Sequence, residues 1–424
     1  MAANEGRALV SRVKELGGRD ASYLENESVK VLVDDQGGMI PQLTSVQERR
    51  QINAHWLPNF RGNSGEPYRE EKHGDFWKSS LLYNIAGNFP CAPNFGAGHI
   101  VDGITMPPYG WTANMDWKFV KSGVGLQSGA AWALSTLKSP ESAMPMSFIK
   151  IDAVIPSHPV HYTSLTIKNS GAKPIEINTG FHNTVGSPFL QTGCKISASA
   201  DIWTTPAPGG EFDDTTNLAM GAEFIALTKA PLKNGGKANL SEVPGMVGIT
   251  DFVTGAIPSD ASVGWSSLVN PKLKLAYITF FPGPAAKADL ESKDDIILYF
   301  NDLWMQYGGR RFSPWSSWEG GPDLCFCLGL ENSVGAYTYG LEYARSVKKV
   351  LDSPTTVTIP ANETKTLYYG TLFAPYEKNI LDGGIVGISF EEARMICKSS
   401  TESWNYNCDP SFKTLKALNK LLVI

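Results

Sequence analysis

The chain has 424 residues, of which 42% are hydrophobic and 19% are charged, a balance typical of a globular protein with one large core or two domains. The formal net charge of −5 and the scattered Lys and Arg residues predict neither a nucleic-acid partner nor a membrane surface. No stretch approaches 18 uninterrupted apolar residues, and the N-terminus lacks the apolar segment of a signal peptide, so we expect a cytoplasmic protein.

The first segment has a helical pattern. Leu9, Val13 and Leu16 recur at helical spacing, and Gly17-Gly18 is suited to end the helix. Residues 1–27 are therefore predicted to form a helical extension.

Short alternating segments bounded by Gly, Pro and Asn then recur from about residue 28 to 374. Residues 28–34 alternate and run into Asp35-Gln-Gly-Gly, which predicts a strand and a turn. Residues 160–168 and 175–179 alternate on either side of Asn169-Ser-Gly-Ala-Lys-Pro, which predicts a hairpin. Further strands are expected at 272–281, 355–359 and 364–369. Without a linker or a fixed repeat, this pattern favours an all-β fold, one large antiparallel β-sandwich over residues 28–374.

Two loops within this region are rich in Pro, Gly and aromatic residues. They span residues 87–96 and 107–117, and a third aromatic cluster follows at Trp304, Trp315 and Trp318. Such loops suit either the end of a sandwich core or the rim of a polar pocket, where indole and phenol rings stack on sugar rings.

Residues 375–424 are predicted to be a second helical extension. Ser389-Phe-Glu-Glu392 has the spacing of a capping box before residues 393–397. A final amphipathic helix is marked by Phe412, Leu415, Leu418 and Leu422.

Two residues indicate acid–base chemistry. His182 and Glu331 each lie in an apolar β pattern, and an imidazole and a carboxylate can together take and give protons on a neutral polar substrate. A metal site is not expected: His158 and His161 would point to opposite faces of a strand. Cys325 and Cys327 lack a second Cys pair at zinc spacing. The six cysteines are interpreted as buried, reduced thiols.

The motifs, taken in order, resemble those of the aldose 1-epimerase (galactose mutarotase-like) superfamily, and look closest to its glucose-6-phosphate 1-epimerase-like and uncharacterised members. Gly37-Gly38 ends an early strand, the 87–96 loop takes the place of a Gly-Gly-x-Pro loop, and Tyr109-Gly-Trp-Thr-Ala takes that of a His-Gly-Phe-Ala-Arg-like motif. The resemblance spans roughly residues 28–374. It implies a β-supersandwich whose concave face binds a sugar, with His182 as the catalytic acid and Glu331 as the catalytic base, and it implies no cofactor.

Several positions depart from the family pattern. Tyr109 stands where the motif has a substrate-binding His, for which His73 or His99 could substitute. Ala86 and Ala113 replace two Arg residues, which argues against a phosphorylated substrate unless Arg310-Arg311 substitute for them. The family's sugar-binding Asp is assigned to Asp251, with Asp201 and Asp213 as alternatives. The other predicted substrate contacts are Asn94, Trp111, Asn114, Trp315 and Trp318.

The sequence thus predicts an isomerase that interconverts the anomers of an unphosphorylated sugar, acting as a monomer or homodimer on a small carbohydrate. Two alternatives remain open. The first is a carbohydrate-binding protein without turnover on the same scaffold. The second is a glycoside lyase or hydrolase that uses the same His182–Glu331 pair.

Overall fold

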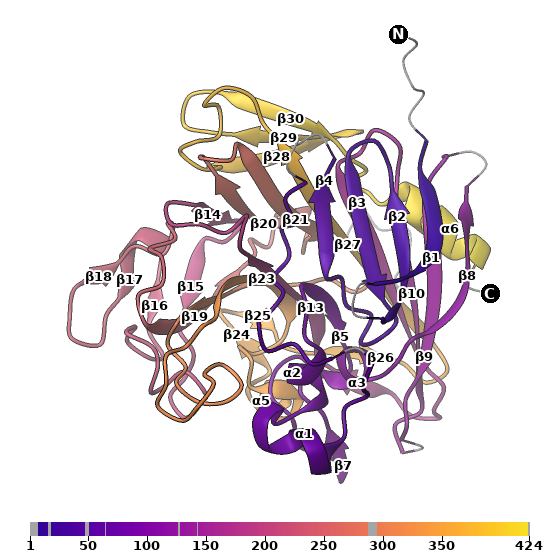
Figure 1. Cartoon of the computed structure of the whole chain (residues 1–424), viewed down its shortest axis with the longest axis horizontal. Helices are drawn as coiled ribbons and strands as arrows, with labels where there is room; N and C mark the ends of the chain where they lie inside the picture. The colour runs from indigo at the N-terminus through magenta and orange to yellow at the C-terminus, as the bar shows by residue number, and fades with distance from the viewer. Residues whose placement is uncertain are drawn as a thin grey trace.

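The computed structural model describes residues 7–15, 18–46, 51–63, 65–125, 128–141, 143–286 and 295–422. Two large antiparallel sheets dominate these residues, and smaller sheets and helices surround them (Figure 1). The sequence prediction of a large antiparallel β-sandwich is therefore confirmed.

The larger sheet has eight strands. In spatial order they are β14 (Lys195–Ala198), β20 (Val263–Asn270), β21 (Leu275–Pro282), β27 (Thr364–Pro375), β11 (Val160–Asn169), β10 (Met146–Val154), β9 (Ala131–Lys138) and β8 (Lys118–Val124). The central strands β11 and β27 pair without interruption from Val160 opposite Leu372 to Lys168 opposite Thr364. Nearly every residue of β11 is buried, because both faces of this part of the sheet are covered.

The second large sheet has seven strands. In spatial order they are β16 (Glu223–Phe224), β15 (Ile202–Thr204), β19 (Ile249–Ala256), β22 (Phe300–Tyr307), β23 (Phe326–Val334), β13 (Thr179–Gly186) and β5 (Asn88–Cys91). Side chains alternate across it. Leu303, Leu328 and Leu330 enter a core that also contains residues of the eight-stranded sheet, whereas Trp304 and Cys327 belong to a separate cluster on the other face.

The N-terminal segment forms strands, so the predicted helix there is wrong. A four-stranded sheet consists of β1 (Leu9–Lys14), β2 (Asp20–Glu25), β3 (Val29–Asp34) and β4 (Gln42–Ser45). The spacing of Leu9 and Val13 is weak evidence for a helix, because Leu9 is exposed and β1 is held by its pairing with β2. Leu16 and Gly17 lie outside the described residues. Tertiary pairing here overrides local periodicity.

The C-terminal segment confirms one predicted helix and replaces the other. Strands β28 (Gly387–Glu391), β29 (Arg394–Lys398) and β30 (Ser403–Asn407) form a meander where the capping-box spacing predicted a helix. The burial of Met395 and Cys397 alternates with exposed Arg394 and Lys398, which is strand periodicity. The final helix, α6 (Lys413–Leu422), forms as expected, and Leu415 and Leu418 pack in a core with residues of the eight-stranded sheet.

In the described part of the chain, four small two-stranded ladders complete the set of strands. They are β6 (His99–Val101) with β7 (Ile104–Met106), β12 (Ile175–Ile177) with β26 (Val357–Ile359), β17 (Ala230–Pro231) with β18 (Lys237–Ala238), and β24 (Lys349–Val350) with β25 (Ser353–Pro354). The hairpin predicted around residues 169–174 is not formed, because β12 pairs with β26 and β11 pairs with β10 and β27. Both strands exist, but their partners are distant in sequence.

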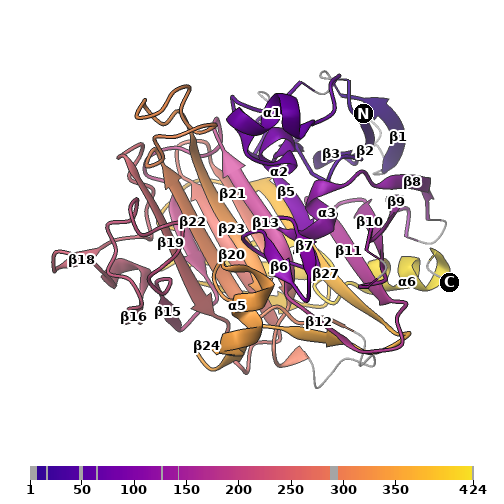
Figure 2. The same cartoon turned by 90° about the horizontal axis from the view of Figure 1, so that it is seen from below.

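Helices also occur inside the chain, where none was predicted. They are α1 (Glu70–Trp77), α2 (Ser80–Asn84), α3 (Gly110–Asn114), the 3₁₀ helix η1 (Leu227–Lys229) and α5 (Gly340–Val347). Helices α1, α2, α3 and α5 lie on one side of the molecule, at the bottom of Figure 1, and the view from that side shows them beside the seven-stranded sheet (Figure 2). Among the helices described, none combines the length and apolarity needed to cross a bilayer.

Candidate functional site

His182 and Glu331 lie side by side on neighbouring strands of the seven-stranded sheet. Strands β13 and β23 pair with Phe181 opposite Asn332 and Thr184 opposite Gly329, a register that sets His182 across from Glu331. The imidazole Nε2 lies 3.5 Å from Glu331 Oε1. An imidazole and a carboxyl that are distant in the sequence are thus adjacent in the fold.

The His182 ring is enclosed by aromatic side chains. Phe89 stacks on it with a centroid separation of 4.6 Å, and Tyr109 and Trp304 meet it edge-on at 4.8 and 5.5 Å. Its Nδ1 lies 3.0 Å from the hydroxyl of Thr184, which leaves Nε2 facing Glu331. Burial lowers the pKa of His182 to about 3, so the ring is neutral at physiological pH.

Glu331 is a buried acid that has no Lys or Arg partner within the part of the chain that the structure describes. It is only 1% exposed, and the distance to His182 is too long for a hydrogen bond, so neither carboxyl oxygen has a hydrogen-bond partner among the described residues. Burial raises the pKa of Glu331 well above its ordinary value, and the nearby charges of Asp302 and Glu211 raise it further. The directions of the two pKa shifts favour a protonated carboxyl beside a neutral imidazole, an arrangement in which one group can give a proton and the other can take one.

Asp302 adds a second buried acid. It lies opposite Glu331 in the β22–β23 ladder, and the hydroxyls of Thr254 and Ser333 donate to its two oxygens, each at 2.6 Å. Burial raises the pKa of Asp302 to about 7 in spite of these hydrogen bonds. Two adjacent carboxyls on one dry sheet face disfavour each other's ionisation.

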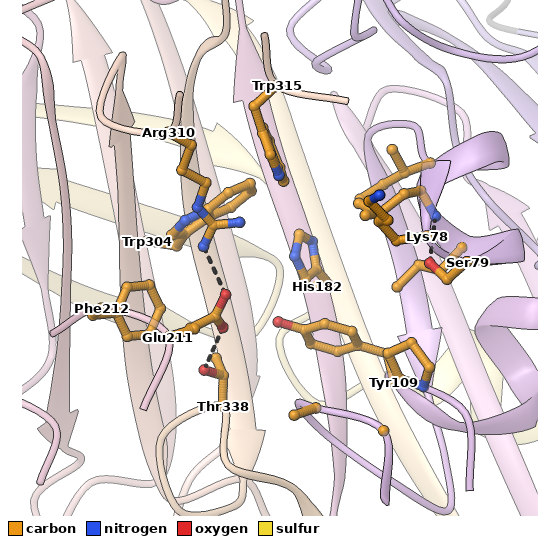
Figure 3. A pocket seen from close by; sticks show the side chains of 16 residues that line it. Lys78, Ser79, Tyr109, His182, Glu211, Phe212, Trp304, Arg310, Trp315 and Thr338 are labelled. Atoms are coloured by element: carbon orange, nitrogen blue, oxygen red, sulfur yellow. Dashed lines mark hydrogen bonds and ion pairs between the residues drawn. The ribbon is translucent and has the colours of Figure 1, made fainter. Parts of the chain in front are cut away.

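A pocket of about 350 Å³ opens in front of His182 (Figure 3). This volume lies within the range of small-ligand sites. In Figure 3 the Tyr109 hydroxyl and the His182 ring point toward its centre. The pocket is lined by Lys78, Ser79, Leu81, Leu82, Ile85, Ala97, Gly98, Pro108, Tyr109, His182, Glu211, Phe212, Trp304, Arg310, Trp315 and Thr338.

One wall carries an ion pair. Arg310 Nη2 donates to Glu211 Oε2 at 2.7 Å, and the Thr338 hydroxyl donates to Glu211 Oε1 at 3.1 Å. The Arg310 guanidinium also lies over the ring of Trp315, 4.6 Å from its centroid, and 5.6 Å from that of Trp304. The wall therefore offers hydrogen-bond donors, acceptors and aromatic faces together.

The loop between β22 and β23 positions Arg310 and Trp315. The Asp323 carboxylate accepts from the backbone N–H of Arg310 at 2.7 Å and from that of Cys325 at 2.8 Å, which closes the base of the loop. Trp315 stacks parallel to Trp56, with centroids 6.2 Å apart. Both pocket residues are thus held by contacts outside the pocket.

Tyr109 reaches the pocket from a tight turn before α3. Its φ of 58° lies in the left-handed region, and Gly110 follows with a φ of 75°. A Cβ at Gly110 would lie 2.3 Å from the carbonyl oxygen of Ala92, so only glycine fits there. This turn aims the phenol at His182.

Among the predicted substrate contacts, Tyr109 and Trp315 line the pocket. Neither His73 nor His99 does. His73 lies in α1, where its Nδ1 accepts from the backbone of Arg69 and its ring packs on Tyr83. Nδ1 of His99 contacts the carbonyl of Ala97, and its Nε2 accepts from the backbone of Glu342.

Asn94, Trp111 and Asn114 lie outside the pocket lining. Asn94 donates to three loop carbonyls and accepts from the backbone of Leu341. Asn114 donates to the carbonyls of Pro108 and Gly110, and Trp111 is a buried core residue. All three hold the two loops in shape.

Asp251 and Trp318 also lie away from the pocket lining. Asp251 is on the other face of β19, beside a smaller cavity, and the hydroxyl of Thr216 donates to it. On the site side of the same strand, Phe252 stacks on Phe212. Trp318 is 64% exposed.

Sequence reasoning missed Glu211, Phe212 and Thr338 and gave little weight to Arg310. The segment Pro208-Gly-Gly-Glu-Phe212 has the same Pro, Gly and aromatic composition as the two loops singled out above, and this was the available signal. All six cysteines are free and buried, as the sequence predicts. Among the described residues, no three His, Cys, Asp or Glu side chains are grouped to hold a metal ion.

Solved structures share this architecture. A "putative aldose 1-epimerase" from Klebsiella pneumoniae superposes with a TM-score of 0.61 at 12% identity, over 87% of this chain and 84% of its own. A galactose mutarotase-like protein from Clostridium acetobutylicum gives 0.57 at 10% identity over 87% and 99%. A galactose mutarotase related enzyme from Lactobacillus acidophilus gives 0.51 at 11% over 85% and 98%. No family model matches the sequence, and no curated protein matches it.

Proposed function

Because the chain has the galactose mutarotase-like fold, we propose that it binds an unphosphorylated aldose in this pocket and interconverts its anomers. The observation that supports this most is that His182 lines the pocket and that its Nε2 lies 3.5 Å from Oε1 of Glu331 on the neighbouring strand. Aromatic rings of Tyr109, Trp304 and Trp315 surround the space in which a sugar ring would lie.

The proposed reaction moves two protons in opposite directions. A base takes the proton of the anomeric hydroxyl while an acid protonates the ring oxygen O5, the C1–O5 bond breaks, and C1=O1 forms. Rotation about C1–C2 and the reverse steps give the other anomer. The uncatalysed reaction proceeds in water, so two positioned groups at about 10²–10⁴-fold each would suffice.

The charge state of the pair suggests which group starts in which role. The low pKa of His182, caused by burial, leaves Nε2 free to accept a proton, and the raised pKa of Glu331 leaves its carboxyl with one to donate. In this direction His182 is the base and Glu331 the acid, the reverse of the roles implied by the family resemblance. The back reaction exchanges the roles.

The test is anomer exchange by NMR or polarimetry across a panel of free aldoses. Glu331→Gln and His182→Asn should each lower the catalysed rate by at least about 10²-fold. The double variant should be little worse than either single variant, because the two groups act in one step. Sugar affinity should change far less, and the surface variant Glu242→Gln should behave as wild type.

A second candidate function, sugar binding without turnover, is favoured by the burial of Glu331. Its carboxyl does not line the pocket, and Tyr109 stands at the position where the family motif has a His. If wild type binds free aldoses but accelerates the exchange of none, the binding function replaces the mutarotase. If no aldose binds, both proposals fail.

A further inference from the structure

We propose that Glu211 sets the charge of the sugar that the pocket accepts. By pairing with Arg310, it favours an uncharged aldose and excludes a sugar that carries a carboxylate or a phosphate. This inference rests on the proposed function, since it specifies the ligand of the same pocket.

Arg310 is the cation of the pocket that would bind an anionic ligand. It is 7% exposed, whereas Lys78, the other basic residue of the pocket lining, is exposed and its Nζ donates to the carbonyl of Asp75. A guanidinium binds carboxylate and phosphate groups through paired hydrogen bonds. Left unpaired, Arg310 would make this a site for anions.

Glu211 already forms an ion pair with Arg310, and other contacts hold it in place. One carboxylate oxygen accepts from Arg310 and the other from Thr338. Its loop is fixed on either side, because the Asp213 carboxylate accepts from the backbone of Gly209 at 2.8 Å and Phe212 is buried against Phe252. The anion opposite Arg310 is therefore a fixed part of the pocket.

An anionic sugar would meet this carboxylate at close range. It would have to displace Glu211 from both partners or lie beside it, and two like charges a few ångströms apart at a protein surface weaken binding at least about tenfold. A neutral sugar faces no such penalty. Its hydroxyls can donate to Glu211, whose side chain is 46% exposed, and accept from Arg310.

The test compares neutral and anionic sugars on wild type and Glu211→Gln. The Gln side chain keeps the shape and can still accept from Thr338, but removes the charge. Binding of D-glucose, D-galactose, D-glucuronate and D-galacturonate is measured by calorimetry or NMR titration at low salt. The uronate-to-aldose affinity ratio should rise at least about tenfold in Glu211→Gln, and Arg310→Gln in the same background should abolish the gain.

Glu242→Gln is the matched control. The Glu242 side chain is equally exposed, at 45%, and forms an ion pair with Lys195 outside the pocket lining. The uronate-to-aldose affinity ratio of Glu242→Gln should therefore equal that of wild type. A ratio that does not change in Glu211→Gln, or wild type that prefers uronates, overturns the inference even if neutral aldoses turn over. If neither wild type nor Glu211→Gln binds any sugar of the panel, the proposed function fails and the inference fails with it. Selective binding of neutral sugars without turnover, with the expected rise in Glu211→Gln, supports the inference and refutes only the catalytic proposal.

Discussion

The free energy of unfolding of wild type should fall as pH rises, and replacing Asp302 by Asn should abolish much of that fall. Asp302 is fully buried on the same face of the seven-stranded sheet as Glu331, and each carboxylate oxygen has one hydroxyl partner, Thr254 or Ser333. An Asn side chain has the same shape and can keep both hydrogen bonds, because the Ser333 hydroxyl can accept as well as donate. The substitution therefore removes the ionisation and little else.

The magnitude follows from the pKa. Burial raises the pKa of Asp302 from 3.8 to about 7, so the folded state holds this proton more tightly than the unfolded chain. The stabilisation is complete below the unfolded pKa and is lost as pH rises through the folded pKa. A shift of roughly three pKa units corresponds to about 4 kcal/mol, of which about 3 kcal/mol is lost between pH 5 and pH 8.

Urea unfolding at pH 5, 6, 7 and 8 measures this effect. The free energy of unfolding of Asp302→Asn, minus that of wild type, should grow by about 3 kcal/mol across the series. Asp201→Asn, at an exposed carboxylate, should show no such growth. If the difference for Asp302→Asn is constant across these pH values, the carboxyl has the same pKa in the folded and unfolded states, and the raised pKa of Asp302 is refuted.

Three further predictions concern the pocket and its support. Trp315→Ala should weaken aldose binding at least about tenfold by calorimetry, because it removes a stacking face and a contact of Arg310; unchanged affinity would place the sugar elsewhere. Thr184→Val should lower kcat about tenfold with little change in KM, since it frees the ring of His182 from its Nδ1 partner; an altered KM alone would contradict this. Tyr277→Phe should cost about 1–3 kcal/mol of unfolding free energy, because buried Asn183 Oδ1 loses the hydroxyl that donates to it and His55 Nε2 loses its partner; a neutral effect would show that water replaces the hydroxyl.

The strands were predictable from the sequence where burial imposes a period of two, but their partners were not. The alternation at residues 28–34 corresponds to β3, and that at 160–168 to β11. The chain around residues 169–174 has good turn chemistry, yet β12 pairs with β26, about 180 residues away. At the N-terminus the helical spacing of Leu9, Val13 and Leu16 predicted a helix, but residues 9–14 instead pair with β2 as strand β1, because local propensity is small compared with sheet formation.

The His182–Glu331 pair was predictable as a candidate, because both residues lie in recognisable strands. The rest of the pocket depends on information that the sequence does not carry. Asp251 and Phe252 are adjacent in β19, and only the register of the folded sheet decides that Phe252 shares the site face with Phe212. Glu211 enters the pocket from a loop, and only the folded chain brings it within 2.7 Å of Arg310, which is distant in the sequence.

The interior face of the same two strands helps to explain how the pair is held. Asn183 and Asn332 follow His182 and Glu331 in sequence and point into the sandwich, where Tyr277 OH donates to Asn183 at 2.5 Å and Tyr369 OH donates to Asn332 at 2.6 Å. Both tyrosines belong to the eight-stranded sheet. A slip of one residue in β13 or β23 would bring an amide into the site and bury His182 or Glu331 among apolar side chains. These buried hydrogen bonds between the two sheets therefore help to fix the register that places His182 beside Glu331.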